Sequence, residues 1–159
     1  MDISTKHENA VIAACRIPAL EARLALLANP DPVSPDRAWI EFYGTAKPTP
    51  GDPPGGDPIV TLMMTEGAGT INEGLFQLVL DTPIEGQITG ATPSTGTIPV
   101  WARVYDFEAA WWADLTVSVE GGGGEIQLAQ TGTEGEPAEP VARLFNGAFA
   151  RIVTAIVQG

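Results

Sequence analysis

The sequence of 159 residues contains a single cysteine, Cys15, and a single histidine, His7. One cysteine cannot close a disulfide within the chain, so a disulfide framework is excluded. One residue of each type also cannot supply the several ligands of the usual zinc sites. A Ser-His-Asp or Cys-His arrangement would have to use His7, which lies in a polar N-terminal segment. The sequence therefore predicts a protein that is not an enzyme, with no catalytic residue, no cofactor and no metal.

Basic residues are scarce. The chain has 8 lysines and arginines against 20 acidic residues, for a formal net charge of −12. Nucleic-acid binding depends on releasing counterions from phosphates with basic side chains, so this composition argues against a nucleic-acid partner. Anionic membrane surfaces are disfavoured for the same reason. The acids are scattered along the chain, which is typical of a solvated surface that keeps a protein soluble.

Long hydrophobic runs are missing as well. The apolar run Ala10–Ile17 is interrupted by Arg16 and followed by Pro18, and it is far shorter than the roughly 20 apolar residues of a membrane span. The first nine residues, Met1–Asn9, are polar and lack the basic start and apolar stretch of a signal peptide. We therefore expect a soluble protein made in the cytoplasm, with no membrane partner.

Turn-forming residues are abundant. The chain has 18 glycines and 14 prolines, and its apolar share of 44% is ordinary for a folded domain. A length of 159 residues fits one domain with one core. This composition is typical of a loop-rich all-β domain.

A helix is predicted only near the N-terminus. Residues 8–28 are rich in Ala, Leu, Glu and Arg, and Leu20, Leu24 and Leu27 recur at helical spacing. Pro18 favours the first turn of a helix, so we expect an N-terminal arm followed by one short helix beginning near Ala19. Residues 1–29 form this arm and helix in the prediction.

The remainder, residues 30–159, carries short apolar or alternating runs separated by turn residues. In the clearest run, Asp114–Val119, apolar residues alternate with Thr116 and Ser118, which is typical of a half-buried strand. Residues 45–58 hold five prolines and three glycines and are predicted to be a loop. The other predicted strands are Ala38–Gly44, Ile59–Met64, Leu75–Leu80, Gln87–Gly90, Thr97–Asp106, Glu125–Gln130, Val141–Phe145 and Phe149–Val157.

Two turns set the expected strand pairing. Four glycines at 121–124 predict a flexible hairpin link between neighbouring strands. Asn146-Gly147 lies between two apolar runs and predicts a tight hairpin that makes the last two strands antiparallel neighbours. Together these features predict an all-β fold: one antiparallel β-sandwich or jelly-roll-like domain over residues 30–159.

The segment DFEAAWW, residues 106–112, contains the candidate functional residues. Trp111 and Trp112 stand side by side in an expected turn. If extended, they face opposite sides of the backbone, so one can close the end of the sandwich while the other is exposed or buried by a partner. Exposed tryptophan is enriched in interface hot spots, so we interpret Trp111 and Trp112 as a subunit or capsid interface.

Three carboxylates lie near this pair in the sequence: Asp106, Glu108 and Asp114. Carboxylates beside aromatic residues are also typical of sugar clefts, so carbohydrate binding stays open as an alternative. The preceding run VWARVY has substantial residues on both faces, which predicts a central strand with Arg103 in a structural ion pair.

The order of these parts resembles a group of small virion structural proteins of tailed bacteriophages and prophages. The resemblance rests on a short helix, ARLALLAN, and an aromatic strand entering a threonine- and proline-rich loop, IEFYGTAKPTPGDPPGGDPIVTLMM. It continues in GTIPVWARVYDFEAAWWADLTVSV and GEIQLAQ. The chain differs from that group at DFEAAWW, where a small Asp/Gly turn is usual, and this difference predicts a contact particular to its own particle.

The resemblance implies assembly rather than catalysis. It implies a capsid cement or decoration protein on the outside of the virion, as a homotrimer that contacts the major capsid protein. A phage tail or baseplate component and a carbohydrate-binding, spike-like module remain as alternatives. None of the motifs that carry the resemblance is a catalytic signature.

Overall fold

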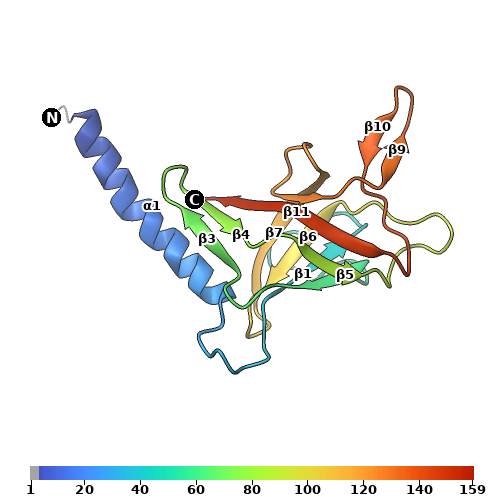
Figure 1. Cartoon of the computed structure of the whole chain (residues 1–159), viewed down its shortest axis with the longest axis horizontal. Coiled ribbons are helices and arrows are strands. Elements are labelled where there is room, and N and C mark those ends of the chain that lie inside the picture. Colours follow the sequence, from blue (N-terminus) through green and yellow to red (C-terminus); the bar gives the residue numbers. More distant parts are fainter. Residues whose placement is uncertain (1–3) are drawn as a thin grey trace.

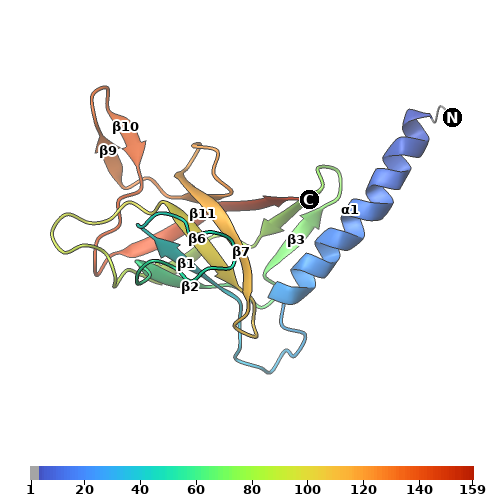
Figure 2. The ribbon, with the colours of Figure 1, turned by 180° about the vertical axis from the view of Figure 1, so that it is seen from behind.

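The computed structural model describes residues 4–159, and the predicted positions 1–3 of the N-terminal arm lie outside it. The chain forms a curled β-sheet with one helix attached to it (Figures 1 and 2). The predicted all-β, sandwich-like fold class is confirmed. Among the residues that the structure describes, no helix is both long and apolar enough to cross a bilayer.

Nine strands form the main sheet, in the order β2-β1-β6-β7-β8-β11-β4-β3, with β5 also paired to β11. Strands β9 and β10 form a separate hairpin. Every pairing is antiparallel except that of β7 with β8. The strands are β1 Trp39–Tyr43, β2 Val60–Met63, β3 Gly69–Asn72, β4 Gln77–Leu80, β5 Ile84–Gln87, β6 Trp101–Tyr105, β7 Trp111–Val119, β8 Ile126–Leu128, β9 Gly132–Glu134, β10 Glu139–Val141 and β11 Phe149–Gln158.

The sheet curls until β5 lies beside β2. Gly86 of β5 faces Leu62 of β2 so closely that a side chain on Gly86 would overlap it. Just beyond, the amide of Gly90 donates to the carbonyl oxygen of Ile59 at 2.9 Å. The concave face encloses the core, whose fully buried large side chains include Phe42, Ile40, Leu62, Leu78, Leu80, Ile126 and Leu128.

The loop at 45–58 covers the opposite, convex face of β1 and β6. The indole Nε1 of Trp101 donates to the carbonyl oxygen of Thr45 at 2.9 Å. Nη1 of Arg103 donates to the carbonyl oxygen of Asp52 at 2.9 Å. Trp101 also stacks on Tyr43, with ring centroids 4.6 Å apart, and both are buried. The proline-rich segment is a loop, as predicted, and it forms the cover of an aromatic layer.

Helix α1 spans Thr5–Leu27, so the prediction of a short helix beginning near Ala19 is wrong. The hydroxyl of Ser4 accepts from the amide of His7 at 3.3 Å and caps the N-terminus, and Pro18 lies inside the helix. Good helix formers on both sides of Pro18 outweigh its lost hydrogen bond. Only Leu20 and Leu27 are buried, and the first half of α1 extends away from the sheet (Figure 1).

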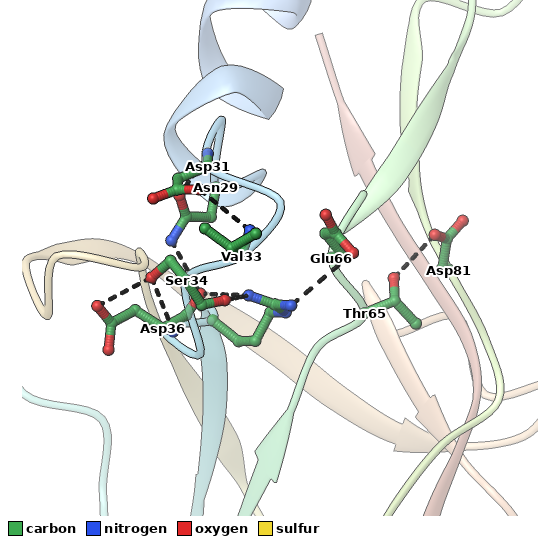
Figure 3. Close-up of polar contacts among 9 residues, drawn as sticks. Asn29, Asp31, Val33, Ser34, Asp36, Thr65, Glu66 and Asp81 are labelled. Carbon is green, nitrogen blue, oxygen red and sulfur yellow. Dashed lines mark hydrogen bonds and ion pairs between the residues drawn. The ribbon is translucent and has the colours of Figure 1, made fainter.

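A polar cluster fastens the exit of α1 to the sheet (Figure 3). Nδ2 of Asn29 donates to the carbonyl oxygen of Asp36 at 3.0 Å, which closes the 29–36 connection into a compact loop. Arg37 then reaches Glu66, with 3.8 Å between Nη2 and Oε2. Oγ1 of the neighbouring Thr65 donates to Oδ2 of Asp81 at 2.9 Å. These contacts fix the course of the connection between α1 and β1 and stabilise the fold.

The four glycines at 121–124 do not form a hairpin, which corrects the prediction. They bring the chain back beside Ser118 and Thr116, where it reverses again, so that β8 runs parallel to β7 with Val117 opposite Ile126. Gly121 and Gly123 have φ of +80° and +81°, a region open chiefly to glycine. A Cβ on Gly124 would lie 2.8 Å from the amide nitrogen of Ser118, so the return is tightly packed.

The prediction of a hairpin at Asn146-Gly147 is also wrong. Oδ1 of Asn146 instead accepts from the amide of Ala91 at 2.8 Å, and the amide of Gly147 donates to Ile88. Strand β11 pairs with β4, β5 and β8. Hydrogen bonds to distant residues therefore outweigh the local tendency to form a hairpin. The segment before Asn146 forms no strand, and its Leu144 makes only a single antiparallel β-bridge, with Thr97.

Strands β3 and β9 lie where no strand was predicted, and β5 and β10 each share only one residue, Gln87 and Val141, with the predicted strands Gln87–Gly90 and Val141–Phe145. The two strands of the β9–β10 hairpin are almost entirely exposed, and the hairpin projects from the sheet at the end opposite α1 (Figures 1 and 2). Arg143, two residues beyond the end of β10, pairs with Glu134, the last residue of β9 before the turn. The guanidinium group lowers the pKa of the Glu134 carboxyl through this hydrogen bond.

A candidate binding cleft between α1 and β7

The two tryptophans open strand β7, so the prediction that they occupy a turn is wrong. The turn is just before them, where Oδ1 of Asp106 accepts from the amides of Glu108 at 2.9 Å and Ala110 at 2.8 Å. Tyr105 of β6 pairs with Trp111, while the preceding Val104 pairs with Ala113. Trp112 is therefore the extra residue of a β-bulge, which bends β7 and separates the environments of the two indoles.

Trp111 lies on the convex face of the sheet and is 44% exposed. Its Nε1 donates to Oδ1 of Asp114 at 3.1 Å. The guanidinium carbon of Arg103 lies 5.5 Å from the ring centroid, within cation–π distance. The indole of Trp111 is thus held in place while almost half of it remains accessible.

Trp112 contributes mainly to contacts within the protein. Its side chain packs against the hydrophobic core and is half-buried. Its Nε1 donates to the carbonyl oxygen of Arg23 in α1 at 3.2 Å. Trp112 therefore joins β7 to the last turns of the helix, and Trp111 is the member of the pair that offers more surface to a partner.

Arg103 and Asp114 form the predicted ion pair, which is confirmed. Nε and Nη2 of Arg103 donate to Oδ1 and Oδ2 of Asp114 at 2.6 and 2.8 Å. Hydrogen bonding to Asp114 raises the pKa of the Arg103 guanidinium. Because both carboxylate oxygens are already held, Asp114 is placed to orient Trp111 rather than to exchange a proton.

A cleft of about 430 Å³ separates β7 from the C-terminal half of α1. Its volume lies within the range of roughly 300–1,000 Å³ that is usual for small-molecule sites. One wall comes from the helix and the other from β7 and its neighbours. The lining residues are Arg23, Leu26, Asp106, Trp111, Trp112, Ala113, Asp114, Leu115, Glu125 and Val157.

Three charged side chains of the cleft have hydrogen-bonding capacity left: Glu125, Arg23 and Asp106, which uses only Oδ1. Oε2 of Glu125 accepts from the amide of Thr116 at 2.8 Å and from its hydroxyl at 3.1 Å. Nη1 of Arg23 makes a long contact of 3.4 Å with the carbonyl oxygen of Gln158. Within residues 4–159, Oε1 of Glu125 and Nε and Nη2 of Arg23 have no hydrogen-bond partner.

The three acidic residues predicted to lie near the tryptophans do not all lie in the cleft. Asp106 and Asp114 reach the cleft, whereas Glu108 lines a separate depression beside Trp39. Sequence reasoning missed Arg23 and Glu125, because nothing near either residue marks it as close to the tryptophans. They lie close to the tryptophans because α1 packs beside β7 and because the 121–124 connection places β8 parallel to β7.

The described residues show neither a metal-binding cluster nor an unpaired buried polar group. Over residues 4–159, no group of three or more His, Cys, Asp or Glu side chains is placed to hold a metal ion. Every buried side-chain nitrogen or oxygen of these residues has a hydrogen-bond partner. The buried polar groups therefore stabilise the fold, and the cleft is the best-formed candidate for binding.

Comparison with known proteins found no match to this chain among protein families, curated proteins or solved structures.

Proposed function

We propose that the protein is a non-enzymatic structural component of a tailed-phage virion, a capsid cement or decoration protein that bridges capsid subunits. One observation carries this proposal most directly. The first half of α1 extends from the sheet (Figure 1), and along the side that continues toward the core contact Ala10 is exposed while Ala13 and Ile17 are only partly buried. An isolated helix of this length is marginal in water, so such an extension is best explained by a partner that covers it.

The spacing of small and apolar residues on α1 favours a second copy of the chain as that partner. Ala10, Ala13 and Ile17 continue, in steps of three and four residues, the row that packs against the sheet through Leu20 and Leu24. This is the spacing of helices that associate with one another. We propose that these rows meet in a homotrimer.

The β9–β10 hairpin is the second projecting element, at the opposite end of the molecule (Figure 1). It exposes Glu134, Glu136 and Glu139, and Arg143 beyond β10 forms an ion pair with Glu134. We propose that this hairpin contacts the major capsid protein. The contact at Trp111 and Trp112 stays a prediction, with Trp111 as the more accessible residue of the two.

The mechanism of a cement protein is physical. Internal pressure separates capsid subunits at their junctions, and a protein that spans a junction opposes this with the contact area that it adds. Burial of apolar area contributes roughly 25 cal/mol per Å² before the costs of association. Several weak contacts on one trimer also reinforce one another, because the first contact raises the effective concentration for the next.

The test uses particles of the phage or prophage that encodes the chain. Heads and tails are separated and probed for the protein, and heads lacking it are then mixed with purified protein and heated. We expect the protein on heads only, and we expect its addition to raise the rupture temperature. Its presence on tails alone, or binding that leaves the rupture temperature unchanged, would reject the cement function.

The oligomeric state is tested with light scattering after size-exclusion chromatography. We expect a trimer for the wild type and a folded monomer for Ala13→Glu, which places a charge in the row. Ala22→Glu, on the opposite side of α1 and exposed, is the matched control and should remain a trimer. A monomeric wild type would remove the helix contact from the proposal.

A further inference from the structure

We propose that the cleft between α1 and β7 binds a neutral saccharide, with Trp111 as the stacking surface and Glu125 and Arg23 as the polar contacts. This inference does not depend on the cement function. It rests on the cleft of about 430 Å³, on the accessible indole and on the free hydrogen-bonding atoms of Glu125 and Arg23.

The stacking surface is pre-organised. Trp111 is fixed at one end by the hydrogen bond from its Nε1 to Asp114 and along its ring by Arg103. A side chain that is already immobile loses little entropy when a ligand covers it, so more of the contact energy appears as affinity. The exposed part of the ring suits a ligand that has an apolar face.

The polar groups match hydroxyls rather than an anionic ligand. Glu125 offers one free carboxylate oxygen as an acceptor, and Arg23 offers guanidinium N–H groups as donors. Adjacent sugar hydroxyls can both donate and accept, so they can satisfy the two residues together. The cleft is also lined by Asp106 and Asp114, and this acidic surround disfavours an anionic ligand.

Leu26, Leu115 and Val157 complete the lining with apolar surface. Polar and apolar groups share the walls almost equally, which suits a ligand that carries both apolar faces and hydroxyl groups. The cleft is partly open to solvent, so a chain of sugars has room to extend out of it. We therefore expect recognition of one or two sugar units within a longer glycan.

The experiment titrates the isolated full-length protein with neutral saccharides of known composition. A panel of hexoses, deoxyhexoses, N-acetylhexosamines and their disaccharides is followed by the NMR signals of the four tryptophan indoles. Trp111→Phe assigns the Trp111 signal. We expect at least one sugar to give a saturable shift of the Trp111 and Trp112 indoles, with the Trp39 and Trp101 signals unmoved.

Two variants identify the contacts. Trp111→Ala should weaken binding at least tenfold, and Glu125→Gln should weaken it several-fold, because the amide keeps one acceptor for Thr116 but loses the charge. Glu108→Gln is the matched control, since Glu108 lies outside the cleft, and it should bind as the wild type does. Thermal unfolding of each variant verifies that it is folded.

Three outcomes would overturn the proposal. The first is the absence of a saturable shift with any neutral sugar, and the second is equal binding by Trp111→Ala. The third is a wild-type oligomer that Trp111→Ala dissociates without any sugar binding, which would make the cleft a subunit contact. None of these results depends on capsid binding, so this proposal and the cement function can fail separately.

Discussion

Arg103 and Asp114 lie opposite each other on β6 and β7 and form a bidentate ion pair whose side chains are only 5% and 7% exposed. Arg103 also lies between the rings of Trp101 and Trp111, at 5.4 and 5.5 Å from their centroids. The guanidinium group of Arg103 therefore contacts the loop at 45–58, the stacked aromatic residues beneath it and the cleft residue Trp111. The predictions below begin with this pair.

Removing one partner of the pair should be costly. Asp114→Asn leaves a buried guanidinium without its counter-charge, and we expect a loss of about 3–5 kcal/mol in the free energy of unfolding. Urea unfolding followed by tryptophan fluorescence measures it. The control is Glu85→Gln, which breaks the exposed pair with Arg151, where about 0–1 kcal/mol is expected. Equal losses in the two variants would show that burial does not decide the effect.

The tight connection of four glycines between β7 and β8 should not accommodate a side chain at position 124. We expect Gly124→Ala to destabilise the fold by about 1–3 kcal/mol, because the new Cβ would lie 2.8 Å from the amide nitrogen of Ser118. Gly132→Ala, where a Cβ would meet nothing within 4 Å, serves as the control and should be nearly neutral. Midpoints of thermal unfolding compare the two, and a neutral Gly124→Ala would contradict the tight return.

Pro18 should weaken α1. Because proline inside a helix costs up to about 3 kcal/mol relative to alanine, Pro18→Ala should raise both helicity and thermal stability. Circular dichroism at 222 nm measures this change. Pro35→Ala, in the exposed connection after α1, should instead lower stability by about 0.4–1 kcal/mol through the unfolded state. A drop in helicity for Pro18→Ala would mean that the proline has a structural role.

Tyr43 should make the fold sensitive to alkaline pH. Burial, and then the hydrogen bond to Glu41, raise the pKa of its phenol far above the ordinary value near 10. The folded state then keeps a proton that the unfolded state releases, so stability is complete below about pH 10 and falls as the pH rises further. The free energy of unfolding, measured from pH 8 to 11, should fall more steeply in the wild type than in Tyr43→Phe. Equal slopes would contradict a raised pKa.

Much of the sheet follows from local sequence patterns. Asp114–Val119 alternates apolar and polar residues, and in β7 Leu115 is buried and Val117 and Val119 pack against the core, while Thr116 is exposed. The buried runs around Phe42 and Leu78 were recognisable as strands for the same reason. What local patterns miss is a partner far away in the chain. Asn146 was expected to form a hairpin, but it bonds to Ala91 instead.

The candidate site was only half predictable. The aromatic run marked Trp111 and Trp112, and the two-faced strand indicated the ion pair of Arg103. Arg23 and Glu125 lie about 90 residues before and about a dozen after the tryptophans, and only tertiary contacts bring them to the same cleft. A parallel pairing across so short a return is uncommon, because parallel neighbours usually need a crossover of a dozen or more residues.

The single thiol of the chain has a practical consequence. Cys15 is exposed on the projecting half of α1, about half a helical turn around the axis from Ala13 and Ile17. A maleimide dye or a nitroxide can therefore be attached there without introducing or removing any other cysteine. Distances between such labels on neighbouring copies would report how the helices come together, from the free protein to the assembled particle.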